Sequence, residues 1–324
     1  MNKFSRLAAT LSTAAVAACF ATAGFAADIF VIGGKPDDPF WSIVKRGAED
    51  AGIVAEKQGG SVTWLGPQNY DNLGVDAAEL IRQAISQGAD AIVAPDWVPE
   101  AMDPAFEAVK KAGIPFIVIN AGGIEAADKL GALNYVGSDD YEAGKAAGKY
   151  FAGKDIKNVI CVNTLPGAAN IEANCKGLTE GIKEAGGTGE VLPLPATSFG
   201  NQTAVAQAVK AYLLQHPDVG GIYTVSDVDA NASINGVMQS GKSGKVQVGG
   251  LNMDETILGN IQSGKQLFAI DQQGYMQGYL AASILNAHVN FGLTVPTREI
   301  LTGPGIIDAS NVEVTMEGMK KGAR

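Results

Sequence analysis

The chain has 324 residues, of which 46% are hydrophobic, 18% are charged and 41 are glycine. This composition is typical of an α/β protein with about two domains of roughly 150 residues each. Acidic residues outnumber basic ones by 34 to 24, so the formal charge is −10 at pH 7. With this charge and no basic patch, we expect neither nucleic acid nor an anionic membrane surface as a partner.

The first 26 residues have the pattern of a secretory signal peptide. Lys3 and Arg6 form a positively charged start, 7–20 is an alanine-rich apolar run, and Gly24–Ala26 is a small-x-small cleavage site. We therefore expect an exported protein that is cleaved at the end of this segment. Lipidation of Cys19 is an alternative, because the residues before it resemble a lipoprotein cleavage box. No later stretch is apolar over the roughly 18 residues that a membrane span needs.

Two cysteines lie beyond this segment, Cys161 in an expected strand and Cys175 in the expected helix that follows. In an oxidising compartment, both a disulfide and two buried thiols are consistent with the sequence. The two histidines, His216 and His288, lie far apart and have no partners at metal-ligand spacing. The sequence thus predicts no metal site, no catalytic triad and no cofactor.

Short apolar strands alternate with amphipathic helices along the first half of the chain. The strands are expected at 29–32, 62–65, 91–94 and 115–120, and the helices at 40–58, 72–87 and 100–111. Because the loops between them are short, this β-α-β order requires a parallel sheet with helices on both faces.

The second half of the chain repeats this alternation. Helices are expected at 140–152, 170–185, 202–214, 228–239, 255–263 and 273–290, and strands at 157–162, 189–193, 221–225, 246–250, 267–271 and 297–301. Segments 80–96 and 208–227 each run from a helix through an aspartate into a strand that ends at another aspartate. This echo favours two similar α/β lobes over one large sheet.

The stretch Ile29–Trp41 joins the first expected strand to the first expected helix. Asp38 precedes Pro39, which is the pattern of an N-cap followed by proline at the first helical position. Phe40 and Trp41 then fall on the first helical turn. Ligands of open α/β sheets bind outside the carboxyl ends of the strands. These residues form either a ligand-binding edge or an ordinary cap with packing contacts, and this stretch alone favours neither.

Polar residues recur at the expected carboxyl ends of strands in both halves. They are Asp38, Asp96, Asn120, Asp227, Asn252 and Asp271-Gln272-Gln273. Each of them alone is explained by a helix cap or a turn. Aromatic residues accompany them: Phe40, Trp41, Trp97 and Phe199. The combination is what a sugar site requires, since hydroxyls need polar partners and the C–H faces of a sugar need aromatic rings.

A Walker A pattern at 236–243 (GVMQSGKS) has the wrong context for a phosphate loop. Such a loop follows a strand and precedes a helix, so that the helix N-terminus faces the phosphates. Here an expected helix precedes the pattern and an expected strand follows it. Gly241 is therefore interpreted as the residue that ends the helix, and nucleotide binding is excluded.

Five segments together resemble the ribose-binding-protein family of periplasmic solute receptors, the type I sugar-binding proteins of ABC importers. The segments are DPFW at 38–41, AGIPFIVIN at 112–120, YVGSDDYEAG at 135–144, HPDVGGIYTVSD at 216–227 and VQVGGLN at 246–252. The resemblance extends over roughly 28–305. It implies a periplasmic, monomeric protein with two similar, doubly wound parallel-sheet lobes.

The family fold also implies a hinge of three crossings between the lobes. By this resemblance the crossings are expected near Ser138-Asp139, near 271–273 and near 301–303. Lobe one is then expected to contain 28–138 plus 273–301, and lobe two 139–272 plus 302–324.

Binding positions carry over from the family onto residues of both lobes. They are Asp38, Phe40, Trp41, Asn120, Asn174, Phe199, Asp227 or its neighbour Ser226, Asn252 and Gln272. Asp96 and Trp97 lie beside a further family contact position, which is Ala94 here, and are expected to bind as well.

This sequence departs from the family at its charged positions. Family members that bind ribose-like pyranoses commonly carry Asp-Arg where this chain has Asn120-Ala121. A second family arginine corresponds to Asn174, and a family aspartate corresponds to Asn252. A pocket without arginine but with up to four aspartates would repel sugar acids and phosphates, because an unpaired buried anion is costly. We therefore expect a neutral sugar or sugar alcohol, with an amino sugar as the alternative.

The resemblance implies a carrier without enzymatic activity, which closes on its solute and delivers it to the membrane permease of an ABC importer. A chemoreceptor ligand-binding role is an alternative that uses the same fold. The effector domain of a sugar-responsive repressor is disfavoured by the export signal and by the lack of a helix-turn-helix. An exported α/β enzyme is disfavoured because no nucleophile–base pair is visible in the sequence.

Overall fold

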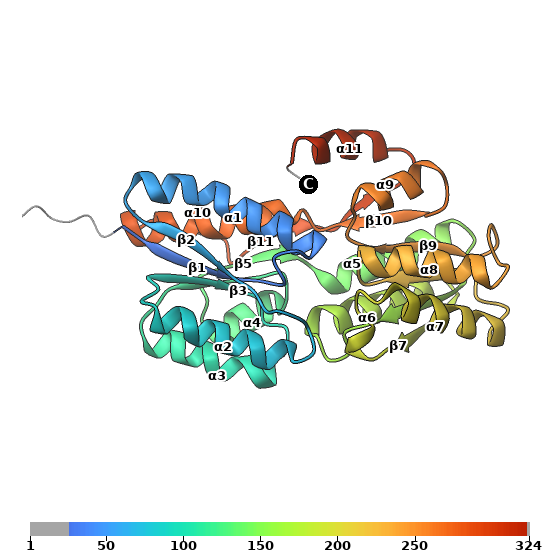
Figure 1. The fold of residues 1–324 in the computed structure, drawn as a ribbon, viewed down its shortest axis with the longest axis horizontal. Coiled ribbons are helices and arrows are strands. Elements are labelled where there is room, and N and C mark those ends of the chain that lie inside the picture. Colours follow the sequence, from blue (N-terminus) through green and yellow to red (C-terminus); the bar gives the residue numbers. More distant parts are fainter. Residues whose placement is uncertain (1–25, 323–324) are drawn as a thin grey trace, which may run out of the picture.

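The computed structural model describes residues 26–322 and shows two α/β lobes side by side (Figure 1). Residues 1–25 of the predicted signal peptide, including Cys19, lie outside the described residues. Among the described helices, none is long and apolar enough to cross a membrane.

Lobe one is built on a six-stranded, fully parallel sheet with the order β11-β5-β4-β3-β1-β2. Its strands are β1 (Asp28–Ile32), β2 (Ser61–Leu65), β3 (Ala91–Ala94), β4 (Phe116–Ile119), β5 (Tyr135–Ser138) and β11 (Glu299–Gly303). Its helices are α1 (Pro39–Lys57), α2 (Leu73–Ser86), α3 (Pro99–Lys111), α4 (Gly123–Leu130) and α10 (Gly274–Phe291). Helices α1 and α10 cover one face of the sheet, and α2 and α3 cover the other (Figure 1).

Lobe two has a second six-stranded sheet with the order β12-β10-β9-β8-β6-β7. Its strands are β6 (Asn158–Asn163), β7 (Thr188–Pro193), β8 (Gly221–Thr224), β9 (Gln247–Leu251), β10 (Phe268–Asp271) and β12 (Gly305–Ile307). Its helices are α5 (Asp140–Gly153), α6 (Ala169–Glu184), the 3-10 turn η1 (Ala196–Ser198), α7 (Gln202–Gln215), α8 (Asp227–Gln239), α9 (Glu255–Gln262) and α11 (Val312–Lys320). Only the edge strand β12 runs antiparallel to its neighbour. The predicted fold class, two similar doubly wound lobes, is confirmed.

The chain passes between the two sheets three times: from β5 to α5, from β10 to α10, and from β11 to β12. The second and third passages are joined by two hydrogen bonds, one buried and one partly buried. Thr302 Oγ1 donates to the carbonyl of Gln272 at 2.7 Å, and Gln273 Nε2 donates to the carbonyl of Thr302 at 2.8 Å. We propose the lobe limits 28–138 plus 273–301 and 139–272 plus 302–324, because the chain passes between the sheets near these residues.

Helices α5 and α10 follow the first two passages, and a glycine allows each of them to contact the backbone of a neighbouring helix. A Cβ on Gly144 of α5 would lie 1.9 Å from the carbonyl oxygen of Asn174 in α6. A Cβ on Gly47 of α1 would lie 2.1 Å from the carbonyl oxygen of Tyr275 in α10. The two lobes therefore use the same device to pack a helix closely beside the hinge.

A disulfide joins Cys161 of β6 to Cys175 of α6, and both residues are buried. The alternative of two free thiols, which the sequence left open, is not what the structure shows. The bond fixes α6 against β6, the strand next to the edge strand β7, and the first turn of α6 reaches the cleft between the lobes.

Candidate functional site

The site begins at the first turn of α1. Asp38 Oδ1 accepts a hydrogen bond from the backbone N–H of Trp41 at 3.1 Å, and Pro39 takes the first helical position. Asp38 is thus the predicted N-cap. Its second oxygen, Oδ2, accepts from the hydroxyl of Tyr70 at 3.1 Å. Both carboxylate oxygens of Asp38 are therefore engaged within lobe one.

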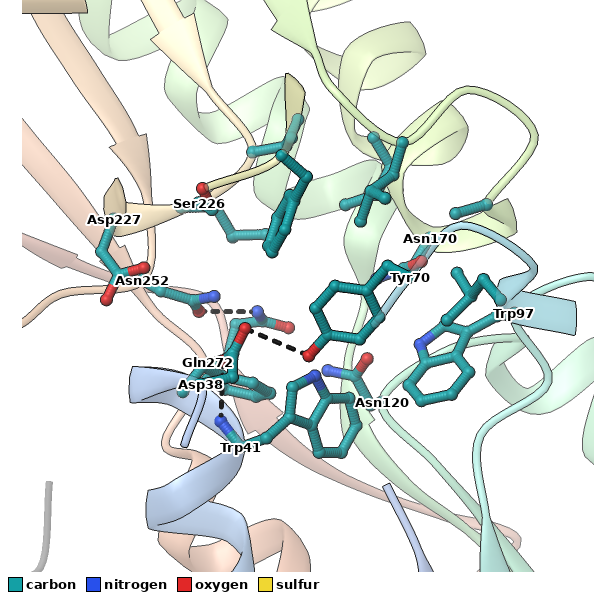
Figure 2. A pocket seen from close by; sticks show the side chains of 18 residues that line it. Asp38, Trp41, Tyr70, Trp97, Asn120, Asn170, Ser226, Asp227, Asn252 and Gln272 are labelled. Atoms are coloured by element: carbon teal, nitrogen blue, oxygen red, sulfur yellow. Dashed lines mark hydrogen bonds between the residues drawn. The ribbon is translucent and has the colours of Figure 1, made fainter. Parts of the chain in front are cut away.

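Between the lobes, at the carboxyl ends of both sheets, lies a cavity with about 550 Å³ of empty space, which includes space open to solvent (Figure 2). The lobe-one residues and hinge residue that line it are Asp38, Phe40, Trp41, Tyr70, Leu73, Trp97, Asn120 and Gln272. The lobe-two residues are Leu165, Ala168, Asn170, Ile171, Phe199, Val225, Ser226, Asp227, Leu251 and Asn252. No lysine or arginine is among these lining residues.

Aromatic rings form the lobe-one wall of the cavity. Trp41 makes edge-to-face contacts with Phe40 and Trp97, with ring centroids 5.2 and 5.3 Å apart. Trp64, which is outside the lining, supports Trp41 from behind at 6.2 Å. Because each ring is held by the next, the wall is preorganised to receive the C–H face of a ring-shaped solute.

Two asparagines at strand ends have left-handed backbone conformations. Asn120 follows β4 with φ 60°, and Asn252 follows β9 with φ 66°. Asn tolerates this region better than most residues because its short polar side chain bonds locally. The conformation places an amide at the edge of each sheet, and the carbonyl oxygen of Asn252 accepts from Gln272 Nε2 at 2.8 Å. Gln272 Oε1 has no partner among the described residues.

Asp227 carries the free carboxylate oxygen of the cavity. Ser226, rather than Asp227, caps α8, because Ser226 Oγ accepts from the backbone N–H of Asp229 at 3.1 Å. Asp227 Oδ1 accepts from the backbone N–H of Val228, and Oδ2 has no partner among the described residues. Burial raises the pKa of Asp227 to about 7, and the negative charges of Asp38 and Asp254 add to this effect.

Asp229 holds the lobe-two wall from behind. It is fully buried, and its Oδ2 accepts from Thr164 Oγ1 at 2.6 Å. Burial raises its pKa to about 6, and hydrogen bonds from Thr164, Ser226 and the backbone of Gly200 act in the opposite direction. These contacts tie together the loops that carry Leu165 and Phe199 into the cavity.

Nine of the eleven residues predicted to bind the ligand line this cavity. They are Asp38, Phe40, Trp41, Trp97, Asn120, Phe199, Asp227, Asn252 and Gln272. Asp96 and Asn174 are not among the lining residues. Asp96 is buried with neither carboxylate oxygen bonded among the described residues, and burial, together with the charge of Asp103, raises its pKa to about 6.

Asn174 lies one helical turn behind the cavity. Its Oδ1 accepts from the hydroxyl of Tyr223 at 2.6 Å, and its Nδ2 lies 3.5 Å from the buried carboxylate of Asp140. Asn170, four residues earlier on the first turn of α6, is the amide that lines the cavity, and its Oδ1 has no partner among the described residues. The position carried over from the family and the position at the cavity thus differ by one turn.

Most of the remaining lining residues were not predicted to bind the ligand: Tyr70, Leu73, Leu165, Ala168, Asn170, Ile171, Val225 and Leu251. Tyr70 follows the carboxyl end of β2, so the rule that identified Asp38 and Asn120 could have found it. The aliphatic residues carry no pattern that separates a cavity wall from an ordinary core.

The described part of the chain contains no group of three His, Cys, Asp or Glu side chains arranged to hold a metal ion. The chemistry that the cavity offers is hydrogen bonding and ring stacking. Figure 2 shows polar groups from both lobes facing the same space, with Asp227 and Asn252 opposite Trp41 and Trp97.

Residues 29–293 match the family described as the periplasmic binding protein domain. A xylose/arabinose-binding protein from Sulfolobus acidocaldarius is 26% identical over 88% of this chain and 75% of its own length. The ribose import binding protein of Bacillus subtilis is 25% identical over 76% of each chain. A carbohydrate transporter from Acidothermus cellulolyticus 11B, solved in complex with myo-inositol, is 29% identical, with a TM-score of 0.82 over 92% of this chain and 99% of its own. Since the family match spans well over half of the sequence, the chain belongs to the periplasmic binding protein family, which confirms the resemblance drawn from its motifs.

Proposed function

We propose that this protein is the solute-binding component of an ABC importer, which binds a neutral sugar or sugar alcohol between its lobes and delivers it to a membrane permease. The observation that carries the proposal is the cavity between the lobes, whose described lining combines aromatic faces, amides and one free carboxylate oxygen with no cationic side chain. The ligands named for the three relatives, xylose or arabinose, ribose and myo-inositol, are all uncharged polyhydroxy compounds.

Binding and closure are one event in this proposal. Each lobe contributes part of the cavity, and the lobes also touch directly. The backbone N–H of Ala169 donates to the carbonyl of Trp97 at 2.7 Å. A solute that bonds to both walls stabilises the closed arrangement over an open one, and the permease then recognises that arrangement. A chemoreceptor could recognise the same closed form. In either role, the protein binds the solute without changing it chemically.

The test is a binding panel on the purified mature protein. Native mass spectrometry would identify any solute that co-purifies, and thermal shift with pentoses, hexoses, polyols and cyclitols would follow, because a ligand bound only by the folded state raises its apparent stability. Sugar acids and sugar phosphates are the negative set. We expect Trp41→Ala and Asp227→Ala to remove the shift while the free protein stays folded. Tight binding of a sugar acid, without binding of any neutral polyol, would refute the proposal.

An amino sugar is the second candidate, and the unpartnered Oδ2 of Asp227 is the observation that favours it. An ammonium group next to this oxygen would stabilise the ionised carboxylate, whose pKa burial raises to about 7. Calorimetry with D-glucosamine, N-acetyl-D-glucosamine and D-glucose decides between the candidates. Preference for the charged member alone would favour the amino sugar, whereas equal or tighter binding of D-glucose would favour the neutral class.

A further inference from the structure

Tyr70 reaches the cavity from the loop between β2 and α2 and bonds to the first loop of the chain. Its hydroxyl accepts from the backbone N–H of Lys35 at 3.0 Å and donates to Asp38 Oδ2 at 3.1 Å. A phenol has a single hydrogen to donate, and here it is directed at Asp38. The side chain is buried, being 8% exposed. Tyr70 is therefore held in place within lobe one, independently of any solute.

This contact makes the two carboxylates of the cavity unequal. Asp38 accepts from Trp41 with one oxygen and from Tyr70 with the other. Asp227 uses one oxygen for the backbone of Val228 and keeps the other without a partner among the described residues. A carboxylate oxygen has two acceptor sites, so each oxygen of Asp38 has one site taken, whereas Asp227 Oδ2 has no partner among the described residues. A solute hydroxyl at Asp38 therefore shares the carboxylate with Tyr70 and with the start of α1, and its contact is weaker than one to Asp227.

The ring of Tyr70 lines the cavity beside Asp38. It meets Phe199 of lobe two edge to face, with centroids 5.1 Å apart and an interplanar angle of 88°. Leu73 and Leu165 line the same part of the cavity, one from each lobe. A solute edge that lies here contacts rings and aliphatic side chains, which bind C–H and methyl groups more favourably than hydroxyls.

We propose that Tyr70 determines specificity by competing with the solute for Asp38, so that the site selects a neutral sugar or polyol whose edge toward Asp38 lacks a hydroxyl, as in a deoxy sugar. This inference rests on the proposed function, since it describes the solute class of the same cavity. Asp227 then makes the carboxylate contact to the solute, and Asp38 positions Tyr70 and the first turn of α1.

The experiment compares hydroxylated and deoxygenated probes by isothermal titration calorimetry. The probes are D-glucose and myo-inositol, each with its monodeoxy derivatives, and D-galactose with D-fucose. In the wild-type protein, we expect one ring position at which the deoxy derivative binds at least as tightly as its parent. In Tyr70→Phe, Asp38 Oδ2 loses its donor, and the parent should gain about tenfold to a hundredfold over that same derivative, the range for a hydrogen bond to a charged group.

Two further variants separate this role from a structural one. Tyr275→Phe removes a comparable tyrosine–aspartate bond, to Asp50 on the outer side of lobe one, and should leave the ranking of the probes unchanged. Asp38→Asn keeps a residue that can cap α1. The gain of Tyr70→Phe requires the carboxylate of Asp38, so the double variant Asp38→Asn, Tyr70→Phe should lose that gain.

The inference is overturned if Tyr70→Phe ranks the probes as wild type does, if the double variant Asp38→Asn, Tyr70→Phe keeps the gain of Tyr70→Phe, or if wild type requires every hydroxyl of the parent. Those outcomes leave the proposed function intact, because the wild-type protein still binds a sugar or polyol. If wild type binds none of the sugars or polyols in the binding panel, the proposed function fails and this inference fails with it.

Discussion

At the scale of single residues, Asp38 and Asp227 show how position decides what a carboxylate can do. Both stand at the start of a helix that follows a strand. Asp38 is the N-cap of its helix, whereas Ser226 takes that role beside Asp227. This difference of one position leaves Asp227 with a free oxygen in the cavity. The sequence identified both residues, but which of them is free depends on Tyr70, 32 residues from Asp38.

Asp227 should make both stability and solute binding depend on pH. Its pKa is about 7 in the folded protein and 3.8 as the ordinary value, so the folded state retains a proton that the unfolded state releases between these limits. Stability of the free protein should therefore fall as pH rises from about 4 to 7 and level off above it. Chemical denaturation across this range should show a smaller fall for Asp227→Asn than for wild type.

Affinity for a neutral solute should show the opposite trend. A solute hydroxyl donates to the ionised form of Asp227, so binding should weaken by up to about tenfold per pH unit below 7. Calorimetry from pH 5.5 to 8.5 measures this change in affinity, because the range extends to both sides of the pKa of about 7. A flat profile in wild type, or the same slope in Asp227→Asn, would show that this carboxylate does not bind the solute.

At the scale of elements, length and periodicity decided what could be predicted. Helix α2 was predicted from its spacing of apolar residues, and the four-residue strands β3 and β8 were predicted from their short apolar runs. The short elements α4, β5, β12 and α11 were not predicted. β12 has three residues, and the four-residue strand β5 includes a glycine, so neither has an apolar pattern that distinguishes it from the flanking loops. Asn174 was carried over from a family position, whereas Asn170, one turn earlier on α6, lines the cavity.

The close contact between α5 and α6 should be sensitive to one methyl group. In Gly144→Ala the new Cβ would overlap the carbonyl oxygen of Asn174, which lies 1.9 Å away. The two backbones must then separate, and we expect a loss of about 1–3 kcal/mol in the free energy of unfolding. Gly153→Ala, at the end of the same helix with nothing within 4 Å of the new Cβ, is the control and should be neutral or slightly stabilising. Urea denaturation of both variants distinguishes a packing effect from a general effect of alanine.

The disulfide between β6 and α6 should contribute to stability far more than to binding. It closes a loop with a sequence separation of 14, for which restriction of the unfolded chain amounts to about 3 kcal/mol. We expect the double variant Cys161→Ala, Cys175→Ala to unfold at a lower temperature and at a lower urea concentration. Its affinity for the solute should stay close to that of wild type, since neither cysteine lines the cavity. A large loss of affinity at a temperature where the variant is folded would contradict this separation.

At the scale of the whole molecule, the two lobes are joined by the hinge and by direct contacts across the cleft. The three passages of the chain form the hinge. The direct contacts are those of Trp97 with Ala169 and of Tyr70 with Phe199. The family resemblance could predict the hinge, because the passages follow from the order of strands. It could not predict the contacts across the cleft, because they join loops whose side chains differ among proteins of one fold.

Removing a contact across the cleft should weaken closure as well as binding. Phe199→Ala removes the lobe-two partner of Tyr70 and part of the cavity wall, and we expect solute affinity to fall by about tenfold or more. Small-angle X-ray scattering should show a smaller solute-induced decrease in the radius of gyration at equal solute concentration. Leu214→Ala, at a residue of lobe two that is 62% exposed, should change neither quantity. Equal compaction and affinity in Phe199→Ala would show that this contact is dispensable.

The left-handed backbone at Asn120 and Asn252 limits how this receptor can acquire new ligands. Few residue types other than glycine, asparagine and aspartate adopt a φ near 60° without strain. Single substitutions that introduce a bulky or β-branched side chain at either position would strain the backbone and lower the stability of the fold, whatever their effect on ligand recognition. Tyr70, Trp97 and Asn170 lie in loops or on a helical turn without a positive φ and are free of this restriction. Diversification of the binding site is therefore expected to proceed mainly through these three positions, with the two strand-end positions largely confined to glycine, asparagine and aspartate.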